Sequence, residues 1–308
     1  MPRYAIITPV FNEAEFVGPM IASVLRQDAM PAKWIFVDDG STDGTVQLLH
    51  HLASLSGLIE VVRLPTKSQR RPGGEGIIQY ALQRLNLDDY DYLARFDADL
   101  LFDKDYMLRL FQEFDKNPKL GIAGGELFIE RHNGMLQPEK QPVTHVRGAL
   151  KMYRMACFKD IGGLAADMGW DMIDETYAWM KGWETRSFPQ CQAIHRRPTG
   201  GGISRLRYFW QNGRAEYLSW GDPLFVLLKA AKIFVLDRAP MGALSFTAAF
   251  LSCYAHGVSR LQEPQFVACR RKYHRSRLRS WFTAPRHEQT WCEQAAIRSV
   301  AGQRTDDC

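Results

Sequence analysis

The chain has 308 residues, of which 46% are hydrophobic, and this is enough to build one large domain or two smaller ones. Charged residues make up 24% of the chain, a proportion that is typical of globular proteins and excludes an intrinsically disordered chain. The six cysteines are scattered and form no CxxC pair, so we expect a reducing compartment and no structural zinc site. The sequence begins without the apolar stretch of a signal peptide, and we expect the catalytic part to be cytosolic.

Strands and helices are expected to alternate over the first hundred residues. Short apolar runs rich in β-branched residues predict strands at residues 3–10, 33–38, 58–64 and 91–97. Apolar residues at helical spacing predict helices at residues 12–27, after the turn at 39–44, and at 75–85. This alternation is typical of a mostly parallel α/β sheet with helices on both faces, in which ligands bind beyond the carboxyl ends of the strands.

Four aspartates lie at predicted strand ends: Asp38, Asp39, Asp97 and Asp99. Asp97 and Asp99 are one residue apart, and like charges this close repel unless a cation or a strong donor lies between them. Such a pair can chelate Mg²⁺ or Mn²⁺, although an Asp-x-Asp motif alone is a weak signal. Asp38 and Asp39 can hold a turn, but one carboxylate suffices for that, and the second can accept hydrogen bonds from a nucleobase or a ribose.

The pattern loosens beyond the first hundred residues. We expect a helix at residues 103–118, a strand at 120–131, a surface loop at 132–145 and a helix at 171–181, ended by Gly182. The α/β character therefore extends to about residue 200.

The C-terminal third differs in character. Residues 222–237 are apolar with two lysines on one face, as in an amphipathic helix, and residues 239–258 carry no formal charge. Twenty such residues are long enough to span a membrane. Proline, glycine, serine, threonine and histidine dilute the stretch, however, and we favour a helix that lies in the membrane interface or packs against protein.

Positive charge gathers near the C-terminus. Residues 1–259 are neutral overall, so the net charge of +5 lies in residues 260–308, with six Lys and Arg at 270–279. Such a cluster beside apolar helices attracts an anionic membrane surface, and a solvated basic helix is the alternative. Nucleic acid is not expected as a partner, since the basic run has only Tyr273 as an aromatic residue and no recognised module surrounds it.

Four segments of the sequence together resemble family 2 of the glycosyltransferases. In chain order they read TPVFNEAEFV, IFVDDGSTDGT, RFDADLLF and GWDMIDETYAWMKGW, and the resemblance covers about residues 3–200. It implies the GT-A fold and inverting transfer of a sugar from a nucleotide-diphosphate sugar to a hydroxyl acceptor, assisted by Mg²⁺ or Mn²⁺. A UDP- or GDP-sugar is the donor that we expect.

The resemblance also assigns roles in donor binding. The residues concerned are Pro9, Val10, Asn12, Glu13, Asp38, Asp39, Arg71 and Asp97. Among them, Asp39 together with Asp38 is expected to bind the base or the ribose. Arg71 lies after the third strand, where the family often has a basic donor contact, although SQRRPGGEG departs from the family's usual glycine and asparagine pattern.

The same resemblance implies a metal site. Asp97 and Asp99 match the family's metal and phosphate motif. His195 ends another predicted strand, where members of this fold often supply a third ligand to the metal. A packed or surface histidine is the alternative interpretation of His195.

The family's catalytic base is an aspartate before the helix that ends in glycine and an aromatic residue. Asp171 matches that position, although Trp170 replaces the acid that usually precedes it. Asp174 lies one helical turn further and can face the same cleft, so we prefer Asp171 and keep Asp174 as the alternative, with Glu175 third. The helix dipole favours carboxylates at a helix start and would explain any one of the three.

The resemblance thus implies an inverting glycosyltransferase, and we expect it to act in cell-surface polysaccharide or glycolipid synthesis on a glycan or polyprenol-linked acceptor. We expect a catalytic domain at residues 1–221 and a helical region at 222–308 that attaches it peripherally to the cytosolic face of the membrane. A sugar nucleotidyltransferase is the alternative enzyme, but its Gly- and Arg-rich phosphate loop is missing after the first strand. A catalytically inactive membrane-bound scaffold is the non-enzymatic alternative, and a dehydrogenase is disfavoured because no G-x-G-x-x-G follows the first strand.

Overall fold

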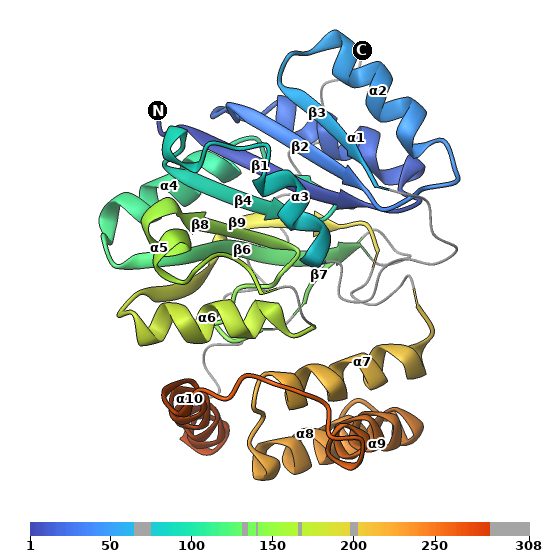
Figure 1. Ribbon diagram of the computed structural model, residues 1–308, viewed down its shortest axis with the longest axis vertical. Helices are drawn as coiled ribbons and strands as arrows, with labels where there is room; N and C mark the ends of the chain where they lie inside the picture. Colours follow the sequence, from blue (N-terminus) through green and yellow to red (C-terminus); the bar gives the residue numbers. More distant parts are fainter. Residues whose placement is uncertain (65–74, 131–134, 140, 166–167, 198–202, 284–308) are drawn as a thin grey trace.

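The computed structural model describes residues 1–64, 75–130, 135–139, 141–165, 168–197 and 203–283. Figure 1 shows a layered α/β body with a group of helices packed at one end of it. Arg71, the donor contact expected after the third strand, lies outside the described residues.

The first half of the sheet is parallel. Its strands are β1 (Tyr4–Val10), β2 (Lys33–Asp38), β3 (Ile59–Arg63) and β4 (Tyr92–Phe96), in the order β3-β2-β1-β4. The connecting helices are α1 (Ala14–Leu25), α2 (Thr45–Leu55), η1 (Glu75–Ile77), α3 (Ile78–Leu82) and η2 (Leu87–Asp89). Parallel neighbours need crossover connections of this kind, so the predicted alternation of strands and helices is confirmed here.

The second half of the sheet is mixed. Beside β4 come β8 (Leu150–Arg154), β6 (Leu120–Glu130), β9 (Glu184–His195) and β5 (Leu100–Phe102), while β7 (Leu136–Pro138) pairs with β6. Only β6 and β9 are parallel among these described pairs. The helices of this half are α4 (Tyr106–Lys116), α5 (Met155–Asp160) and α6 (Trp170–Met180). The α/β fold class is confirmed, but the mostly parallel character holds only for the first four strands.

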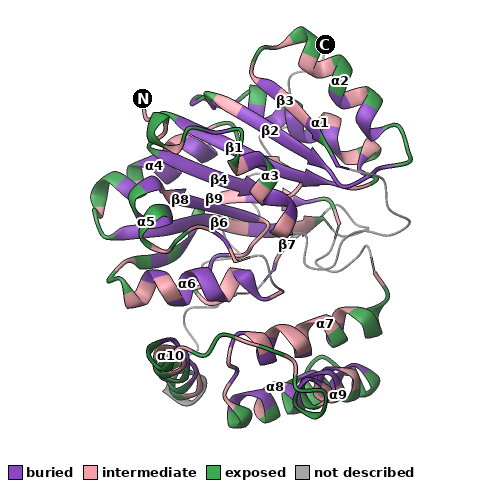
Figure 2. Cartoon of the chain, viewed as in Figure 1, coloured by how far each residue is buried: buried purple, intermediate pink, exposed green. Residues whose placement is uncertain are grey.

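The central strands separate two hydrophobic cores because successive side chains point to opposite faces of a sheet. On one face, Trp34 stacks on Phe36 with 4.7 Å between ring centroids, in one cluster with side chains of α1 and α4. On the other face, Ile35 and Val37 cluster with side chains of α3, α5 and α6. Figure 2 shows these strands as buried along most of their length.

The surface loop expected at residues 132–145 is only partly correct. Strand β7 lies within it and pairs with the end of β6, where Ile129 faces Gln137. Glu139, directly after β7, is buried. The polar composition of this segment conceals the strand, because its ladder of backbone hydrogen bonds does not depend on apolar side chains.

The C-terminal helices are α7 (Arg205–Leu218), α8 (Pro223–Val235), α9 (Pro240–Ala255) and α10 (Pro264–Thr283). Helices α7, α8 and α9 share a hydrophobic core that includes Phe209, Ile233 and Phe246. Gly213 lets α7 approach α9 closely, since a Cβ atom at this position would lie 2.1 Å from the carbonyl oxygen of Phe246. Helix α7 therefore packs with the helices that follow it, although it precedes the domain boundary expected at residue 221.

Helix α10 joins this helical group to the α/β body. The ring of Tyr273 on α10 stacks on Trp179 of α6 with 4.7 Å between ring centroids. The hydroxyl of Tyr177 donates to Glu263 at 2.9 Å, just before α10 begins. Among the helices that the structure describes, none is both long enough and apolar enough to cross a membrane.

Candidate active site

Two chain segments bring polar side chains to the carboxyl edge of the parallel strands. The turn between β4 and β5 carries Asp97 and Asp99, and the amide of Asp97 donates to the carbonyl oxygen of Ala149 at 2.8 Å. Strand β9 ends at His195, which lies opposite Leu100 of β5 in the antiparallel ladder. This register places His195 beside Asp99, the residue that precedes Leu100.

Asp97, Asp99 and His195 form the three-residue cluster that we call the acidic corner. Each of them offers one ligand atom, and these atoms lie within 4.8 Å of one another. Asp99 and His195 are buried, with 3.5 Å between Asp99 Oδ1 and His195 Nε2, whereas Asp97 is partly exposed. The side chains that the sequence predicts as metal ligands thus come together.

Two arginines neutralise the acidic corner. Arg95 Nη1 donates to Asp97 Oδ1 at 2.5 Å and to the carbonyl oxygen of Gly148 at 2.8 Å. Arg197 Nε donates to Asp99 Oδ2 at 2.8 Å, and its Nη2 atom binds the carboxylate of Glu13 at 2.6 Å. Glu13, expected in the nucleotide pocket, is therefore linked to the acidic corner through Arg197.

The charges of the acidic corner shift each other's pKa. Burial alone would raise the pKa of Asp99, but hydrogen bonds and positive charge from His195 and Arg197 lower it. Burial alone would lower the pKa of His195, but hydrogen bonds to Asp99 and Glu139 raise it. Both shifts favour the charged forms: Asp99 is an ionised carboxylate that a cation can bind, and His195 has to lose its proton before its nitrogen can serve as a ligand.

The donor set of the acidic corner fits a divalent cation. Two carboxylates and one imidazole nitrogen are ligands that Mn²⁺ accepts, and carboxylate oxygens also suit Mg²⁺. Arg197 binds only the Oδ2 side of Asp99 among the contacts described, while Oδ1 faces His195. A cation at this point would reduce the repulsion between the carboxylates of Asp97 and Asp99, which is expected from their spacing in the sequence.

The loop after β1 is tied to the loop after β2. Asn12 adopts a left-handed conformation, with φ of 56°, and its side-chain oxygen accepts from the amide of Thr42 at 2.8 Å. The amide of Asn12 donates to the hydroxyl of Ser41 at 2.9 Å. Pro9 and Val10, the last residues of β1, are buried beside β2. These contacts fix the backbone at the edge where we expect the nucleotide.

The two aspartates after β2 differ in their surroundings. Asp38 is buried, and its carboxylate accepts from the amides of Gly40 at 3.3 Å and Ser41 at 3.0 Å. That is the turn-holding role which the sequence leaves open for this pair. Asp39 is also buried, and its amide donates to the carbonyl oxygen of Val10 at 2.9 Å. Asp38 is thus occupied with the turn.

Asp171 and Asp174, the two candidates for the base, occupy different environments on α6. Asp171 lies in the first turn and is partly exposed. It lies close to Gly148, since a Cβ atom added to this glycine would be 3.5 Å from the Cβ atom of Asp171. Gly148 also accepts from Arg95, the partner of Asp97. The segment at Gly148 therefore contacts both the acidic corner and the start of α6.

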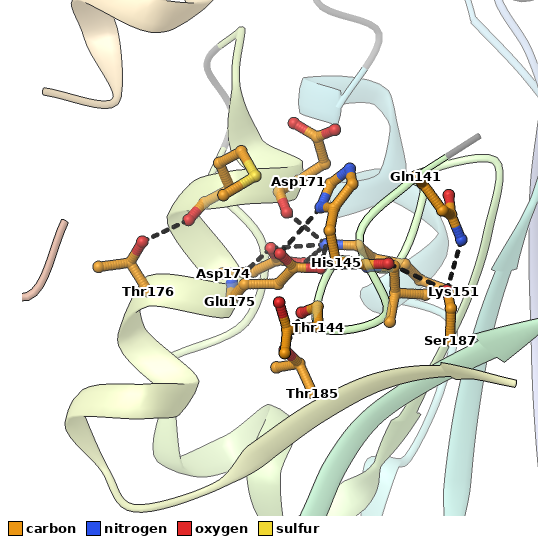
Figure 3. A network of polar contacts seen from close by, with 12 residues as sticks. Gln141, Thr144, His145, Lys151, Asp171, Asp174, Glu175, Thr176, Thr185 and Ser187 are labelled. Atoms are coloured by element: carbon orange, nitrogen blue, oxygen red, sulfur yellow. Dashed lines mark hydrogen bonds and ion pairs between the residues drawn. The ribbon is translucent and has the colours of Figure 1, made fainter. Parts of the chain in front are cut away.

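Asp174, by contrast, is fully buried in a polar network beneath α6 (Figure 3). Its carboxylate accepts from Lys151 Nζ at 2.8 and 3.0 Å and from the hydroxyl of Tyr153 at 2.5 Å. Burial raises the pKa of Asp174, and the charge of Lys151 opposes this rise. With these partners around it, Asp174 is placed to hold α6 against the sheet.

Glu175 belongs to the same network. It accepts from His145 Nδ1 at 3.0 Å and from the amide of Val146 at 2.7 Å, and its own carboxylate is buried. Lys151 Nζ lies 3.3 Å from Glu175 and also donates to the backbone carbonyl of Asp171 at 2.5 Å. The network thus fixes the first turn of α6, which carries Asp171, to strand β8.

Sequence reasoning misses two cations around this site, Arg95 and Lys151, and it also misses the pairing of Arg197 with Asp99. Lys151 stands in the middle of a buried strand, and a charge in an apolar strand is itself a signal of a partner. Arg95 precedes Asp97 by two residues, the spacing that puts both side chains on one side of a strand. The pairing of Arg197 gives no such signal, because it depends on the path of the chain between distant elements.

Comparison with known proteins identifies the family. The sequence model described as glycosyl transferase family 2 matches residues 5–164, which is more than half of the chain. The chain therefore belongs to glycosyl transferase family 2.

Individual relatives cover the chain in part. A poly-β-1,6-N-acetyl-D-glucosamine synthase of Staphylococcus epidermidis is 24% identical over 230 residues, which are 68% of this chain and 53% of that protein. The synthase of that name from Staphylococcus aureus (strain COL) is 23% identical over the same length, with the same coverage. The chain spans about half the length of the curated relatives it matches.

Solved structures share the fold. A mannosyltransferase from Pyrobaculum calidifontis, in complex with GDP-Man and Mn²⁺, superposes with a TM-score of 0.55 at 17% identity, over 97% of this chain and 86% of that one. TarS of Staphylococcus aureus, in complex with UDP-GlcNAc, superposes with a TM-score of 0.50 at 17% identity, over 87% and 79% of the two chains. The expected GT-A fold is thereby confirmed.

Proposed function

We propose that the chain is an inverting glycosyltransferase that moves a sugar from a UDP- or GDP-sugar to a hydroxyl of a glycan or polyprenol-linked acceptor. The observation that carries this proposal is the acidic corner at the carboxyl edge of the parallel strands. Asp171 lies next to Gly148, whose carbonyl oxygen accepts from Arg95, the partner of Asp97 in this corner. The names of the relatives support the donor class, because their structures contain GDP-Man or UDP-GlcNAc. The named polysaccharide synthases support a role in cell-surface polysaccharide or glycolipid synthesis.

Asp97, Asp99 and His195 are the residues that would hold Mg²⁺ or Mn²⁺. When bound, such a cation supplies positive charge to the diphosphate that leaves the sugar, an effect of several kcal/mol in metal enzymes. Arg197 lies beside the same position and carries a fixed positive charge. We propose that Arg197 exchanges part of its contact with Asp99 for a phosphate oxygen of the donor, since guanidinium groups bind both anions.

The nucleoside is proposed to lie along the loops after β1 and β2. Pro9, Val10, Asn12 and Glu13 form one side of this position, and Asp39 accepts a hydrogen bond from the base or the ribose. Asp38 acts indirectly, because its carboxylate already holds the turn that carries Asp39. Arg71 stays a prediction from the sequence alone.

Asp171 is proposed as the catalytic base. It is partly exposed at the start of α6, so its carboxylate can accept the proton of the acceptor hydroxyl as that oxygen attacks the sugar carbon. We do not propose Asp174 as the base. Its carboxylate has no exposed surface and is held by Lys151 and Tyr153.

The catalytic residues lie within residues 1–221, and residues 222–308 are proposed to attach the enzyme peripherally to the cytosolic face of the membrane. The packing of α7 against α9 supports a structural boundary before Arg205 rather than at residue 221. The basic composition of α10 supports an anionic surface as the partner of this region.

The proposal is tested by the release of nucleoside diphosphate from a panel of UDP-, GDP- and dTDP-sugars. We expect one donor to turn over with Mn²⁺ or Mg²⁺ and to stop in excess chelator. Asp171→Asn should keep donor binding and lose turnover, while Glu15→Gln on the exposed side of α1 serves as the matched control. Turnover that persists in chelator, or in Asp171→Asn at the wild-type rate, would contradict the proposed mechanism, and no turnover of any donor would favour an inactive scaffold.

A further inference from the structure

Helices α8 and α9 present large apolar side chains to the solvent. We call these side chains the apolar face: Leu227, Phe234, Val235, Met241, Leu244 and Leu251, each between 57% and 64% exposed. Contiguous exposed groups of this kind are rare on soluble proteins unless the surface meets a partner or a membrane. The apolar face lies outside the candidate active site and needs its own explanation.

The spacing of these residues shows that each helix has two apolar sides. On α8, Val226, Ala230 and Ile233 are buried in the core shared with α7 and α9, while Leu227 and Phe234 point outward. On α9, Phe246 and Cys253 face the same core, and Met241, Leu244 and Leu251 recur outward at intervals of three and seven residues. A helix that only covered a protein core would carry polar residues on its outer side.

The two outward stripes meet where α8 leads into α9. Phe234, Val235 and Leu236 end or follow α8, and Met241 is in the first turn of α9, with all four exposed. Figure 2 shows exposed segments on α8 and α9, at the end of the molecule opposite α2. Exposed apolar side chains therefore continue from the end of α8 into the start of α9.

Positive charge surrounds the apolar face. Residues 203–283 contain thirteen Lys and Arg against four Asp and Glu. Lys232 and Arg238 are exposed beside the apolar side chains, and Arg271, Lys272 and Arg275 are exposed on α10, which contacts α8. A second copy of the chain on this face would bring two positive regions together, whereas an anionic surface is attracted to them.

We propose that the apolar face inserts into the headgroup region of an anionic bilayer, with the surrounding Lys and Arg side chains at the lipid phosphates. This inference deepens the peripheral attachment proposed above and names its surface. Helices α8 and α9 lie in the plane of the interface, each using one apolar side for the protein core and the other for the acyl chains. The long basic side chains then reach the phosphates while their methylene groups stay in the apolar layer.

The test is sedimentation of the full chain with vesicles of phosphatidylcholine, with and without phosphatidylglycerol. We expect binding that needs phosphatidylglycerol and weakens with salt. The double variant Leu227→Ser, Phe234→Ser should bind at least about tenfold more weakly, because two inserted side chains are lost. The control is Leu55→Ser on α2, which removes a leucine that is 71% exposed at the other end of the molecule and should bind like wild type.

Three results would overturn the inference: no binding of the wild-type chain, equal binding by the double variant, or a wild-type dimer in sedimentation velocity that the double variant dissociates. Thermal unfolding of the double variant at the wild-type temperature excludes misfolding as the cause of lost binding. Release of nucleoside diphosphate in solution, without vesicles, is measured on the same proteins. A wild-type chain that binds the vesicles but releases no nucleoside diphosphate counts against the proposed function alone. A wild-type chain that releases nucleoside diphosphate but does not bind the vesicles counts against the apolar face alone.

Discussion

Asp99 is buried and yet keeps a lowered pKa, because His195 and Arg197 contact its carboxylate. A buried carboxylate with such partners is costly to build, and in proteins this arrangement marks sites that bind ligands. Asp97, which is more exposed, is held by Arg95 instead. At the scale of single residues, the acidic corner is therefore a set of paired charges.

Removal of one ligand is the first prediction at this scale. Asp99→Asn should lower the affinity for Mn²⁺ by more than about 100-fold, since a neutral amide replaces a central carboxylate and even outer partners of a metal site cost 10–100-fold. Calorimetric titration with Mn²⁺ measures the change. Asp28→Asn, an exposed aspartate paired with Lys104, is the control and should bind as wild type does. Equal affinities in the wild type and Asp99→Asn would remove Asp99 from the metal site.

Asp171 and Asp174 should give opposite results on substitution by asparagine. Asp171→Asn should lower kcat by about 10²–10⁴ with unchanged unfolding free energy, because the side chain is partly exposed and is proposed to take the proton of the acceptor. Asp174→Asn should lower the unfolding free energy by about 3–5 kcal/mol, since it breaks a buried ion pair with Lys151. Chemical denaturation and donor turnover, measured on both variants, separate the two roles. A stable but inactive Asp174→Asn protein would transfer the role of base to Asp174.

Much of the site could be predicted from residues at strand ends. Asp97, Asp99 and His195 each follow or end an apolar run, so their convergence follows from the topology of an α/β sheet. The turn-holding role of Asp38 could not be separated in advance from nucleotide binding, because both roles place a carboxylate at the same point. The partners Arg95 and Lys151 are fixed by the neighbouring strands β4 and β8, whose pairing no local pattern reveals.

At the scale of elements, periodicity predicts the helices and strands well and their pairing less well. Strand β8 enters antiparallel between β4 and β6, although it follows them in the chain. The apolar pattern of a strand is the same in either direction, so the sequence alone could not distinguish this mixed sheet from a parallel one. The insertion matters for the site, because β8 brings Lys151 beneath the start of α6.

Helix α10 is predicted to loosen at low pH through His274. This side chain is buried, stacks on Phe225 with 4.2 Å between ring centroids, and accepts at Nδ1 from the amide of Asp222 at 3.2 Å. Burial, together with the charge of Arg270, lowers its pKa from 6.5 to about 3. The neutral form is thus the one that packs between α10 and α8.

The sign of this effect follows from linkage. The unfolded chain takes up a proton at His274 near pH 6.5, while the folded chain does so only near pH 3. Its contribution to stability is therefore complete above pH 6.5 and is lost as the pH falls toward 3, by up to a few kcal/mol. Thermal unfolding between these pH values should show a steeper loss in the wild type than in His274→Gln, whose side chain does not titrate. Parallel curves for the two proteins would contradict this role of His274.

At the scale of the whole molecule, a mixed α/β sheet carries the candidate site, and the C-terminal helices pack against α6 through α10 (Figure 1). The apolar-then-basic order of the C-terminal region could be predicted from composition. The core that α7 shares with α8 and α9 could not be predicted, because the close approach of α7 to α9 depends on the missing side chain of Gly213. The same α6 that carries Asp171 thus contacts the helical group proposed to bind the membrane.

The central claim is that Asp97, Asp99 and His195 hold the cation that meets the donor diphosphate. Anomalous diffraction at the manganese edge, from crystals grown with Mn²⁺ and the nucleoside diphosphate that the chain binds, tests it most directly. The account predicts an anomalous peak within about 2.0–2.3 Å of a carboxylate oxygen of Asp97 or Asp99 and of a His195 nitrogen, in contact with the diphosphate. A nucleotide bound at another edge of the sheet, or a peak away from these three residues, would contradict it.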